Sequence, residues 1–451
     1  MDGPTALRQR LPDGVRRAGA TLLGHLVALP ALPILVAVAV AARVRRPSRR
    51  GRPRVVWGPE PILSYAHWSR ALRKAGYESE TVMHSVYPIN RREDFDVLYE
   101  DLAPAGWAFL LAPYRAFARA LFRADVFQHH YSGGFLSGTP LWRVEAELLH
   151  LAGARVVNQA HGNDAYLSSQ IADLSLRHAL LTSYPALARS ESRTRRRVDY
   201  WTARSDCTFG GLQMDGLGRW DVLPCSVATI EVEGWRRRTP YSRGDGRDGG
   251  TVRIAHAPNH RGFKGSEFII DAVKQLRAEG LDVELVLLER VQNAEVRHMF
   301  SGEVDILVEQ IIATGYAMNG VEGMAAGLPV LANLEDDALT AVLRRFSYLD
   351  ECPILSATPE TVRDRLRALV TSPDLRERLG RAGAAYAAKY HSDETAQYLY
   401  GSIYRRIWNR EEIVLLDLFH PLKSDYNRSR PRVEHGLVRN RLPADVAVEA
   451  T

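Results

Sequence analysis

Two loops in the second half of the chain carry residues suited to binding a phosphorylated ligand. The first, HAPNHRGFKG at residues 256–265, places Arg261 and Lys264 three positions apart beside glycines. A planar Arg fork and a Lys point charge together suit a diphosphate. The N-terminus of the helix expected after this loop would add unpaired N–H groups and a favourable dipole. On spacing alone, a solvated basic loop explains the segment equally well.

The second loop, ATGYAMNGVEGMAAGLPVLA at residues 313–332, contains two glycines before a short helix of small residues. Glu322 is expected in the first turn of that helix. A carboxylate there can accept hydrogen bonds from vicinal hydroxyls such as those of a ribose. The alternative is a glutamate that only offsets the helix dipole.

Alternating strand and helix patterns must position these loops. A charged, glycine-rich linker at 236–250 separates two such sets. Parallel sheets with helices on both faces are expected, and ligands bind such sheets at the carboxyl ends of the strands. The expected strands are 54–61, 77–84, 125–134, 155–164 and 206–211 in the first set, then 252–258, 282–289, 304–310 and 329–334 in the second.

The block HAPNHRGFKG, then DILVEQ, then GYAMNGVEGMAAGLPVLA resembles the donor half of family 4 (group 1) GT-B glycosyltransferases. The family pattern has an Arg, then Lys-Gly, then Glu-x-(Phe/Tyr)-Gly…Glu-Ala-Met-Ala-x-Gly-x-Pro-Val. In the first half, AHGND at 160–164 is similar to the family's His-Gly-x-Asp turn. The resemblance spans residues 53–410. It implies an α/β protein with two Rossmann-like, doubly wound domains that face a cleft.

The resemblance also implies roles for individual residues. Arg261 and Lys264 would bind the donor diphosphate and stabilise the charge that develops on the leaving group. His161 would lie near the transferred sugar, where an imidazole can donate or accept a hydrogen bond; a strand-end histidine is the alternative. Glu322 would hold the ribose, and the neighbouring loop would approach the sugar and the phosphates. That donor-binding loop contributes Thr314, Gly315, Tyr316 and Asn319.

The chain departs from the family pattern at two positions of this loop. Thr314 stands where the family has the first of two glutamates, and a hydroxyl hydrogen-bonds more weakly than a carboxylate. Ala317 stands where the family has glycine. If that position requires a positive φ, the alanine would be strained by roughly 1 kcal/mol.

The first half offers candidate acceptor-side residues after its strands. Gly58 and Pro59 follow the first strand, and His129, His130 and Ser132 follow a later one. A metal site formed by the two histidines is disfavoured because adjacent strand residues point to opposite faces. The three cysteines, at 207, 225 and 352, are too scattered for a zinc site or a disulfide framework. No metal and no resident cofactor are expected.

The positive charge of the chain is concentrated at its N-terminal end. The net charge is +6 over 451 residues, and residues 1–54 contain eleven arginines and two aspartates. These arginines flank an uncharged segment, 18–42, that is long enough to cross a bilayer. More arginines follow this segment than precede it, which predicts a cytoplasmic location for the rest of the chain. A re-entrant segment bent by Pro30 and Pro33, a cleaved signal peptide and a buried helix are the alternatives.

These observations predict six parts of the chain. A basic arm with the membrane segment occupies 1–52, an acceptor-side domain 53–235, the linker 236–250, a donor domain 251–385, returning helices 386–420 and a weakly patterned, loosely ordered tail 421–451. The expected function is retaining transfer of a sugar from a nucleotide-sugar donor to a hydroxyl acceptor at the cytoplasmic face of the membrane. The acceptor would be a glycan or a lipid-linked precursor, and nucleic acid is not expected as a partner. A catalytically silent nucleotide-sugar-binding or scaffold protein and a nucleotide-sugar epimerase are the alternatives.

Overall fold

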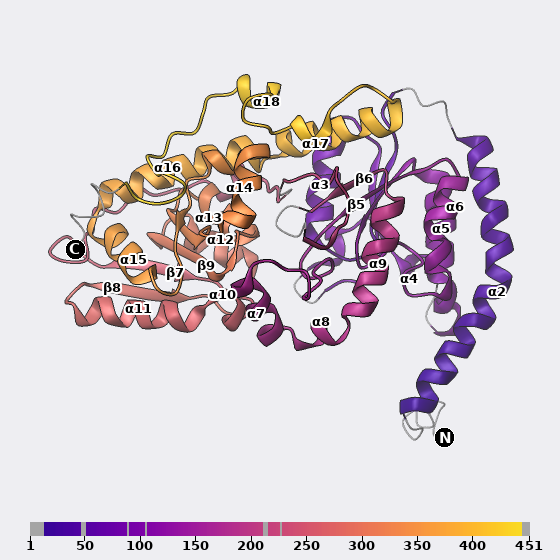
Figure 1. The fold of residues 1–451 in the computed structure, drawn as a ribbon, viewed down its shortest axis with the longest axis horizontal. Helices are drawn as coiled ribbons and strands as arrows, with labels where there is room; N and C mark the ends of the chain where they lie inside the picture. The colour runs from indigo at the N-terminus through magenta and orange to yellow at the C-terminus, as the bar shows by residue number, and fades with distance from the viewer. Residues whose placement is uncertain are drawn as a thin grey trace. The chain divides into compact units, whose positions relative to one another are not determined.

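The computed structural model describes residues 13–46, 51–87, 90–103, 106–210, 215–225 and 228–443, with the backbone only for 13–21 and 106–108 (Figure 1). The described chain forms two compact units. Unit 1 comprises residues 1–161, 199–207 and 407–411, and unit 2 comprises 162–198, 208–406 and 412–451. Of the predicted parts, residues 1–12 and 47–50 of the basic arm and 444–451 of the tail lie outside the described residues. The predicted domain boundaries stay predictions.

Unit 1 is built on a six-stranded sheet with the order β3-β2-β1-β4-β5-β6. The pairings of β1 with β2 and β4, of β2 with β3, and of β4 with β5 are all parallel. The strand order reverses between β1 and β4, which is where doubly wound sheets bind ligands. The strands are β1 (Val55–Trp57), β2 (Ser79–Met83), β3 (Val97–Leu98), β4 (Val126–His130), β5 (Arg155–Gln159) and β6 (Cys207–Phe209).

Aromatic packing attaches helix α3 (Leu63–Lys74) to the sheet of unit 1. The ring of Trp57 in β1 lies 5.4 Å from that of Tyr65 and 5.5 Å from that of Trp68. Its indole N–H donates to Ser79 Oγ at 2.9 Å, so the buried polar edge is satisfied. The other helices of this unit include α2 (Asp13–Arg45), α4 (Tyr99–Leu102), α5 (Ala112–Arg123), α6 (Glu145–Leu151) and α9 (Glu191–Arg204), the last of which begins in unit 2.

Unit 2 is built on a five-stranded sheet with the order β11-β10-β9-β7-β8, whose pairs are all parallel. Its strands are β7 (Val252–His256), β8 (Val283–Leu287), β9 (Ile306–Thr314), β10 (Val330–Asn333) and β11 (Leu355–Ser356). The two parallel α/β sheets confirm the predicted fold class. The helices include α7 (Leu174–Ser183), α8 (Pro185–Arg189), α10 (Arg261–Lys264), α11 (Ser266–Ala278), α12 (Asn293–Phe300), α13 (Met318–Ala325), α14 (Asp337–Phe346), α15 (Val362–Thr371), α16 (Pro373–Tyr390), α17 (Asp393–Tyr404) and α18 (Asp425–Arg428).

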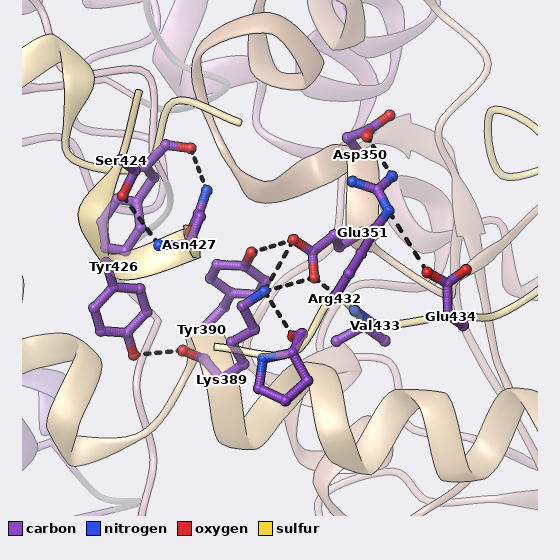
Figure 2. A network of polar contacts seen from close by, with 12 residues as sticks. Asp350, Glu351, Lys389, Tyr390, Ser424, Tyr426, Asn427, Arg432, Val433 and Glu434 are labelled. Carbon is purple, nitrogen blue, oxygen red and sulfur yellow. Dashed lines mark hydrogen bonds and ion pairs between the residues drawn. The ribbon is translucent and has the colours of Figure 1, made fainter. Parts of the chain in front are cut away.

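The C-terminal segment is attached to unit 2 by a buried polar network (Figure 2). Lys389 Nζ donates to both carboxylate oxygens of Glu351, at 3.0 and 2.8 Å, and to Pro431 O at 3.0 Å. The same carboxylate accepts from the Tyr390 hydroxyl at 2.7 Å and from the Val433 N–H at 2.8 Å. The expectation of a loosely ordered tail is therefore wrong for residues 421–443.

The expected apolar N-terminal segment is a single long helix, α2. Its part Leu22–Arg45 is long and apolar enough to cross a membrane by length and composition alone. Pro30 and Pro33 lie inside the helix. Figure 1 shows that the helix changes direction partway along its length.

Candidate functional site

The predicted donor-binding residues of unit 2 gather at the carboxyl ends of β7 and β9. The short helix α10 follows β7, and α11 begins immediately after Gly265. Gly265 joins the two helices with φ 81°, and a Cβ there would lie 2.6 Å from Ile311 Cγ1. Both the backbone conformation and the lack of space require glycine at this position. The last side chain of α10, Lys264, is thereby held against β9.

Lys264 is buried in an ion pair that the sequence interpretation missed. Its side chain is 8 % exposed, and Nζ lies 2.5 Å from Glu309 Oε1 and 2.8 Å from Gln310 Oε1. Glu309, whose side chain is fully buried, also accepts from the Ala317 N–H at 3.2 Å. An ammonium has three N–H donors, so these two contacts leave one for a ligand oxygen. The cation that was predicted to bind phosphate is therefore largely neutralised by a neighbouring carboxylate.

Gln310 connects Lys264 to the loop that follows β9. Its Nε2 donates to Ala313 O at 3.0 Å and to Gly315 O at 2.9 Å, while its Oε1 accepts from Lys264. The β9–β10 pairing also shifts register in this region. Gly315 has φ 106° and donates its N–H to Asn333 O at 2.7 Å. The lysine and the loop are thus held by one side chain.

Arg261 lies at the surface of the same region. Its side chain is 44 % exposed and donates to Glu289 Oε1 and Glu267 Oε1, each at 2.9 Å. Surface pairs of this kind contribute little free energy. Because both pairs are exposed to solvent, a diphosphate can replace these carboxylates at a smaller cost than it could replace Glu309 at the buried Lys264.

Glu322 lies deeper in α13 than the sequence predicted. The helix begins at Met318, so Glu322 is its fifth residue, and the expectation of a first-turn position is wrong. Oε1 accepts a hydrogen bond from Asn293 Nδ2 at 3.1 Å. Burial raises the pKa of Glu322 to about 7, with Asn293 and Arg297 acting in the opposite direction. Near neutral pH the carboxyl group can therefore either donate or accept a hydrogen bond.

The remaining predicted loop residues have different surroundings. Thr314 is buried, and its hydroxyl donates to the carboxylate of Asp173, the residue that caps α7. The Tyr316 hydroxyl lies 2.9 Å from that of Tyr386 and 3.2 Å from His391 Nε2, and burial raises the pKa of Tyr316 well above its usual value. Both side chains are therefore engaged by other protein groups.

Two neighbouring positions clarify the shape of the loop. Ala317 has φ −115°, which any residue adopts, so the strain considered for this alanine is absent. Among the described residues, no hydrogen-bond partner reaches the buried Asn319 Nδ2. An unpaired buried amide is costly unless it binds something. Asn319 thus offers an unused donor in addition to the remaining N–H of Lys264.

A second group of polar residues lies in unit 1, around the end of β4. His161 follows β5, and its ring lies 4.9 Å from that of His130, which stacks on Tyr65 at 4.5 Å. His161 is partly open to solvent, and the surrounding protein atoms desolvate its ring. This desolvation lowers the pKa of His161 to about 4, while the nearby charge of Glu60 acts to raise it. The imidazole is therefore neutral at physiological pH and can exchange hydrogen bonds with a ligand.

Glu60 is an acidic member of this group that the sequence interpretation missed. It follows Gly58, whose close approach to β2 excludes a side chain: a Cβ there would lie 2.0 Å from Val82 O. Although desolvation acts the other way, hydrogen bonds with His84 and Tyr87 hold the pKa of Glu60 below its usual value. The group therefore combines a carboxylate with neutral imidazoles, which suits the binding of hydroxyl groups.

His129 points away from this group, as expected for adjacent strand residues. Its Nδ1–H donates to Gly58 O at 2.9 Å, and Nε2 lies 4.0 Å from Glu145 Oε1. Burial lowers the pKa of His129 to about 4 and raises that of Glu145 to about 8. Both groups are therefore neutral near pH 7, and the pair belongs to the interior of unit 1. Across the part of the chain that the structure describes, no three His, Cys, Asp or Glu residues are arranged to hold a metal ion.

No protein-family model matches the chain, and no curated protein matches it. Solved structures resemble it in fold. HepE of Anabaena in complex with UDP-glucose is 12 % identical with a TM-score of 0.48, over 80 % of this chain and 99 % of that one. WaaG, a glycosyltransferase involved in lipopolysaccharide biosynthesis, is 15 % identical with a TM-score of 0.43, over 76 % and 98 %. A putative UDP-N-acetylglucosamine 2-epimerase from Listeria monocytogenes is 11 % identical with a TM-score of 0.42, over 80 % and 98 %.

The described chain is an α/β protein with two parallel sheets and an apolar N-terminal helix. Membership of family 4 and the cleft stay predictions. Within unit 2 the structure brings Lys264 and the 314–320 loop together through Glu309 and Gln310. His161 belongs to unit 1.

Proposed function

We propose that the protein is a glycosyltransferase that moves a sugar from a nucleotide-sugar donor to a hydroxyl acceptor with retention of anomeric configuration. Unit 2 would bind the donor and unit 1 the acceptor. The acceptor would be a glycan or a lipid-linked precursor at the cytoplasmic face of a membrane. The reaction would need neither metal nor cofactor, because cationic side chains would stabilise the leaving diphosphate.

The observation that carries this proposal is the set of N–H groups available for hydrogen bonding at the carboxyl ends of β7 and β9. Arg261 supplies an exposed guanidinium, Lys264 one remaining ammonium N–H and Asn319 an unpaired amide. Glu322, with a pKa near 7, supplies a buried carboxyl group that can hydrogen-bond a ribose hydroxyl. These side chains could hydrogen-bond the diphosphate, the sugar and the ribose of one nucleotide sugar.

A second candidate function is a catalytically silent nucleotide-sugar-binding protein. One observation favours it: the Thr314 hydroxyl, at the position of the family's first glutamate, donates to Asp173. A hydroxyl that already donates to Asp173 would bind a sugar hydroxyl more weakly than a carboxylate at this position would. The silent protein would keep donor affinity and lack turnover.

Incubation of the purified full-length protein with a panel of nucleotide sugars and a membrane-lipid extract tests the proposal. Mass spectrometry would detect the glycosylated product and the released nucleoside diphosphate. We expect product with at least one donor, and its loss on Lys264→Ala and on His161→Ala. Donor binding without transfer or hydrolysis would favour the silent protein. Interconversion of donor epimers would favour the epimerase.

A further inference from the structure

Helix α2 is attached to unit 1 along one face. The buried side chains of its apolar segment are Ala28, Leu35, Ala39 and Ala42, spaced so that they share one side of a helix. This side packs against α5 and α6, and Figure 1 shows α2 running beside both helices. A Cβ on Gly24 would lie 3.8 Å from Pro140, so the packing reaches the N-terminal part of the apolar segment. The docked part of the helix thus runs from Gly24 to Ala42.

Arg46 fixes the C-terminal end of α2 to the same unit. Its guanidinium donates to Ala152 O at 2.8 Å, Ala124 O at 2.7 Å and Leu121 O at 3.1 Å. It also pairs with Asp125 Oδ1 at 2.8 Å, with both side chains almost fully buried. The helix therefore does not leave the folded unit through a free linker at this end.

The opposite face of α2 is exposed and apolar. Only 22 % of the residues in the most apolar 18-residue stretch of the helix are buried. His25 is the one polar side chain from Leu22 to Ala42. The neighbouring segment η2 (Gly106–Leu111) packs against α2 and exposes Phe109 and Leu110 as well. The exposed apolar side chains of the helix are Leu22, Leu23, Leu26, Leu29, Ile34, Val36, Val40 and Val44. An apolar surface of this extent marks an interaction site.

We propose that α2 lies in the plane of an anionic phospholipid bilayer and docks unit 1 on its surface, rather than crossing the membrane. A helix packed along a folded, polar unit cannot also be surrounded by hydrocarbon over its whole length. Its exposed aliphatic face can enter the boundary between headgroups and acyl chains.

Charge favours a lipid surface as the occupant of this face. Arg43 and Arg45 are exposed at the C-terminal end of the helix, and Arg16 and Arg17 precede the apolar run in the sequence. An in-plane helix places both arginine groups at the same anionic headgroups. A spanning helix would place one pair on the opposite side of the membrane. The proposal does not depend on the proposed function.

Vesicle flotation of the full-length protein tests the docking. We expect binding to vesicles of phosphatidylglycerol and phosphatidylcholine that is stronger than binding to phosphatidylcholine alone. The triple variant Leu26→Glu, Leu29→Glu and Ile34→Glu should weaken binding at least about tenfold, since each change removes apolar burial. A matched triple, Val414→Glu, Leu422→Glu and Val438→Glu, changes equally exposed aliphatic residues of unit 2 and should bind as the wild type does. Equal flotation of the two triple variants, or no flotation of the wild type with any vesicles, would overturn the proposal.

Depth measurements distinguish an in-plane helix from a spanning one. The native cysteines are buried, so Leu26→Cys, Ile34→Cys and Val40→Cys can be labelled selectively with a fluorophore. In vesicles containing brominated lipids, an in-plane helix predicts similar quenching depths at the three positions. A spanning helix predicts depths that differ by several ångströms, since it rises about 1.5 Å per residue. Depths that differ in this way would contradict the proposal. Self-association of the protein in solution, if the triple variant Leu26→Glu, Leu29→Glu and Ile34→Glu abolishes it, would contradict the proposal as well.

Discussion

The buried pair of Lys264 and Glu309 provides a quantitative test of the site in unit 2. Glu309→Gln removes the carboxylate charge and keeps a similar shape. The Lys264 ammonium, 8 % exposed, would then be left with neutral partners only. Loss of one member of a buried ion pair costs about 3–5 kcal/mol. Because glutamine can still accept one hydrogen bond from Nζ, we expect the lower end, a loss of about 3 kcal/mol in the free energy of unfolding.

A double-mutant cycle isolates this interaction. Lys264→Met alone leaves a buried carboxylate and should cost a similar amount, whereas Lys264→Met with Glu309→Gln removes both charges. The double variant should recover most of the loss, so the interaction energy should approach the sum of the two single losses, about 6 kcal/mol. Urea unfolding measures the free energies, and hydrogen exchange of peptides from β9 shows whether the loss occurs in unit 2.

The same variants separate stability from ligand binding. Glu309→Gln leaves the ammonium without its counter-charge, so its affinity for nucleoside diphosphates should rise while stability falls. Lys264→Met should weaken affinity even in the double variant that regains stability. Additive unfolding energies in the cycle would refute the ion pair. Equal diphosphate affinity in all four proteins would refute the placement of Lys264 at the ligand.

Four further variants test other parts of the structure. Folding raises the pKa of Glu322 from 4.5 to about 7. Its protonation therefore stabilises the folded state fully below pH 4.5, and this stabilisation is lost as the pH rises through 7. In urea unfolding between pH 5 and 8, the free energy of unfolding of the wild type should fall by up to about 3 kcal/mol more than that of Glu322→Gln. Gly265→Ala should cost about 2–4 kcal/mol and Gly280→Ala only about 1, because both have positive φ but only the first would meet Ile311. Arg46→Ala should speed hydrogen exchange along α2, because it removes charge-assisted bonds worth about 1.5–3 kcal/mol.

Each of these expectations has a clear contrary result. Parallel pH profiles for wild type and Glu322→Gln would show that this carboxyl does not titrate near neutrality. Equal losses for the two glycine variants would show that the contact with Ile311 has no energetic effect. Unchanged exchange in α2 after Arg46→Ala would show that the helix is held by its apolar face alone.

The positions of the site loops could be predicted from the sequence because the signals are local. A short apolar run followed by glycine and basic residues predicts a strand, a turn and a helix start. β7 at Val252–His256, the short helix carrying Arg261 and Lys264, and α11 at Ser266–Ala278 follow this pattern. The strands β3 and β11 were missed because each has two residues, too few to show any periodicity.

The partners of the site residues could not be predicted because they come from distant positions. Glu309 lies 45 residues after Lys264, and Asp173 lies 141 residues before Thr314. Only the folded sheet brings such residues together. One signal for Glu309 was present: a charged residue inside the apolar run ILVEQII predicts a buried carboxylate, which requires a partner.

The position of Glu322 was predicted wrongly because the start of its helix was placed too late. The sequence suggested a start at Gly320, whereas α13 begins at Met318, directly after the extended Ala317. Helix boundaries depend on capping contacts, here the Ala317 N–H donating to Glu309. Glu309 thus contacts both Lys264 and Ala317, the residue that precedes α13.

Titration calorimetry with a panel of nucleoside diphosphates tests the central claim, that unit 2 binds the diphosphate of a nucleotide sugar, most directly. Arg261→Ala should weaken the affinity at least about tenfold through loss of a charge-assisted contact worth about 1.4 kcal/mol or more. Arg253→Ala is the matched control, since Arg253 is 51 % exposed and pairs with Glu284 on β8 in the same sheet. It should bind as the wild type does. Equal affinities for the two variants, or no binding of any nucleoside diphosphate by the wild type, would contradict the account.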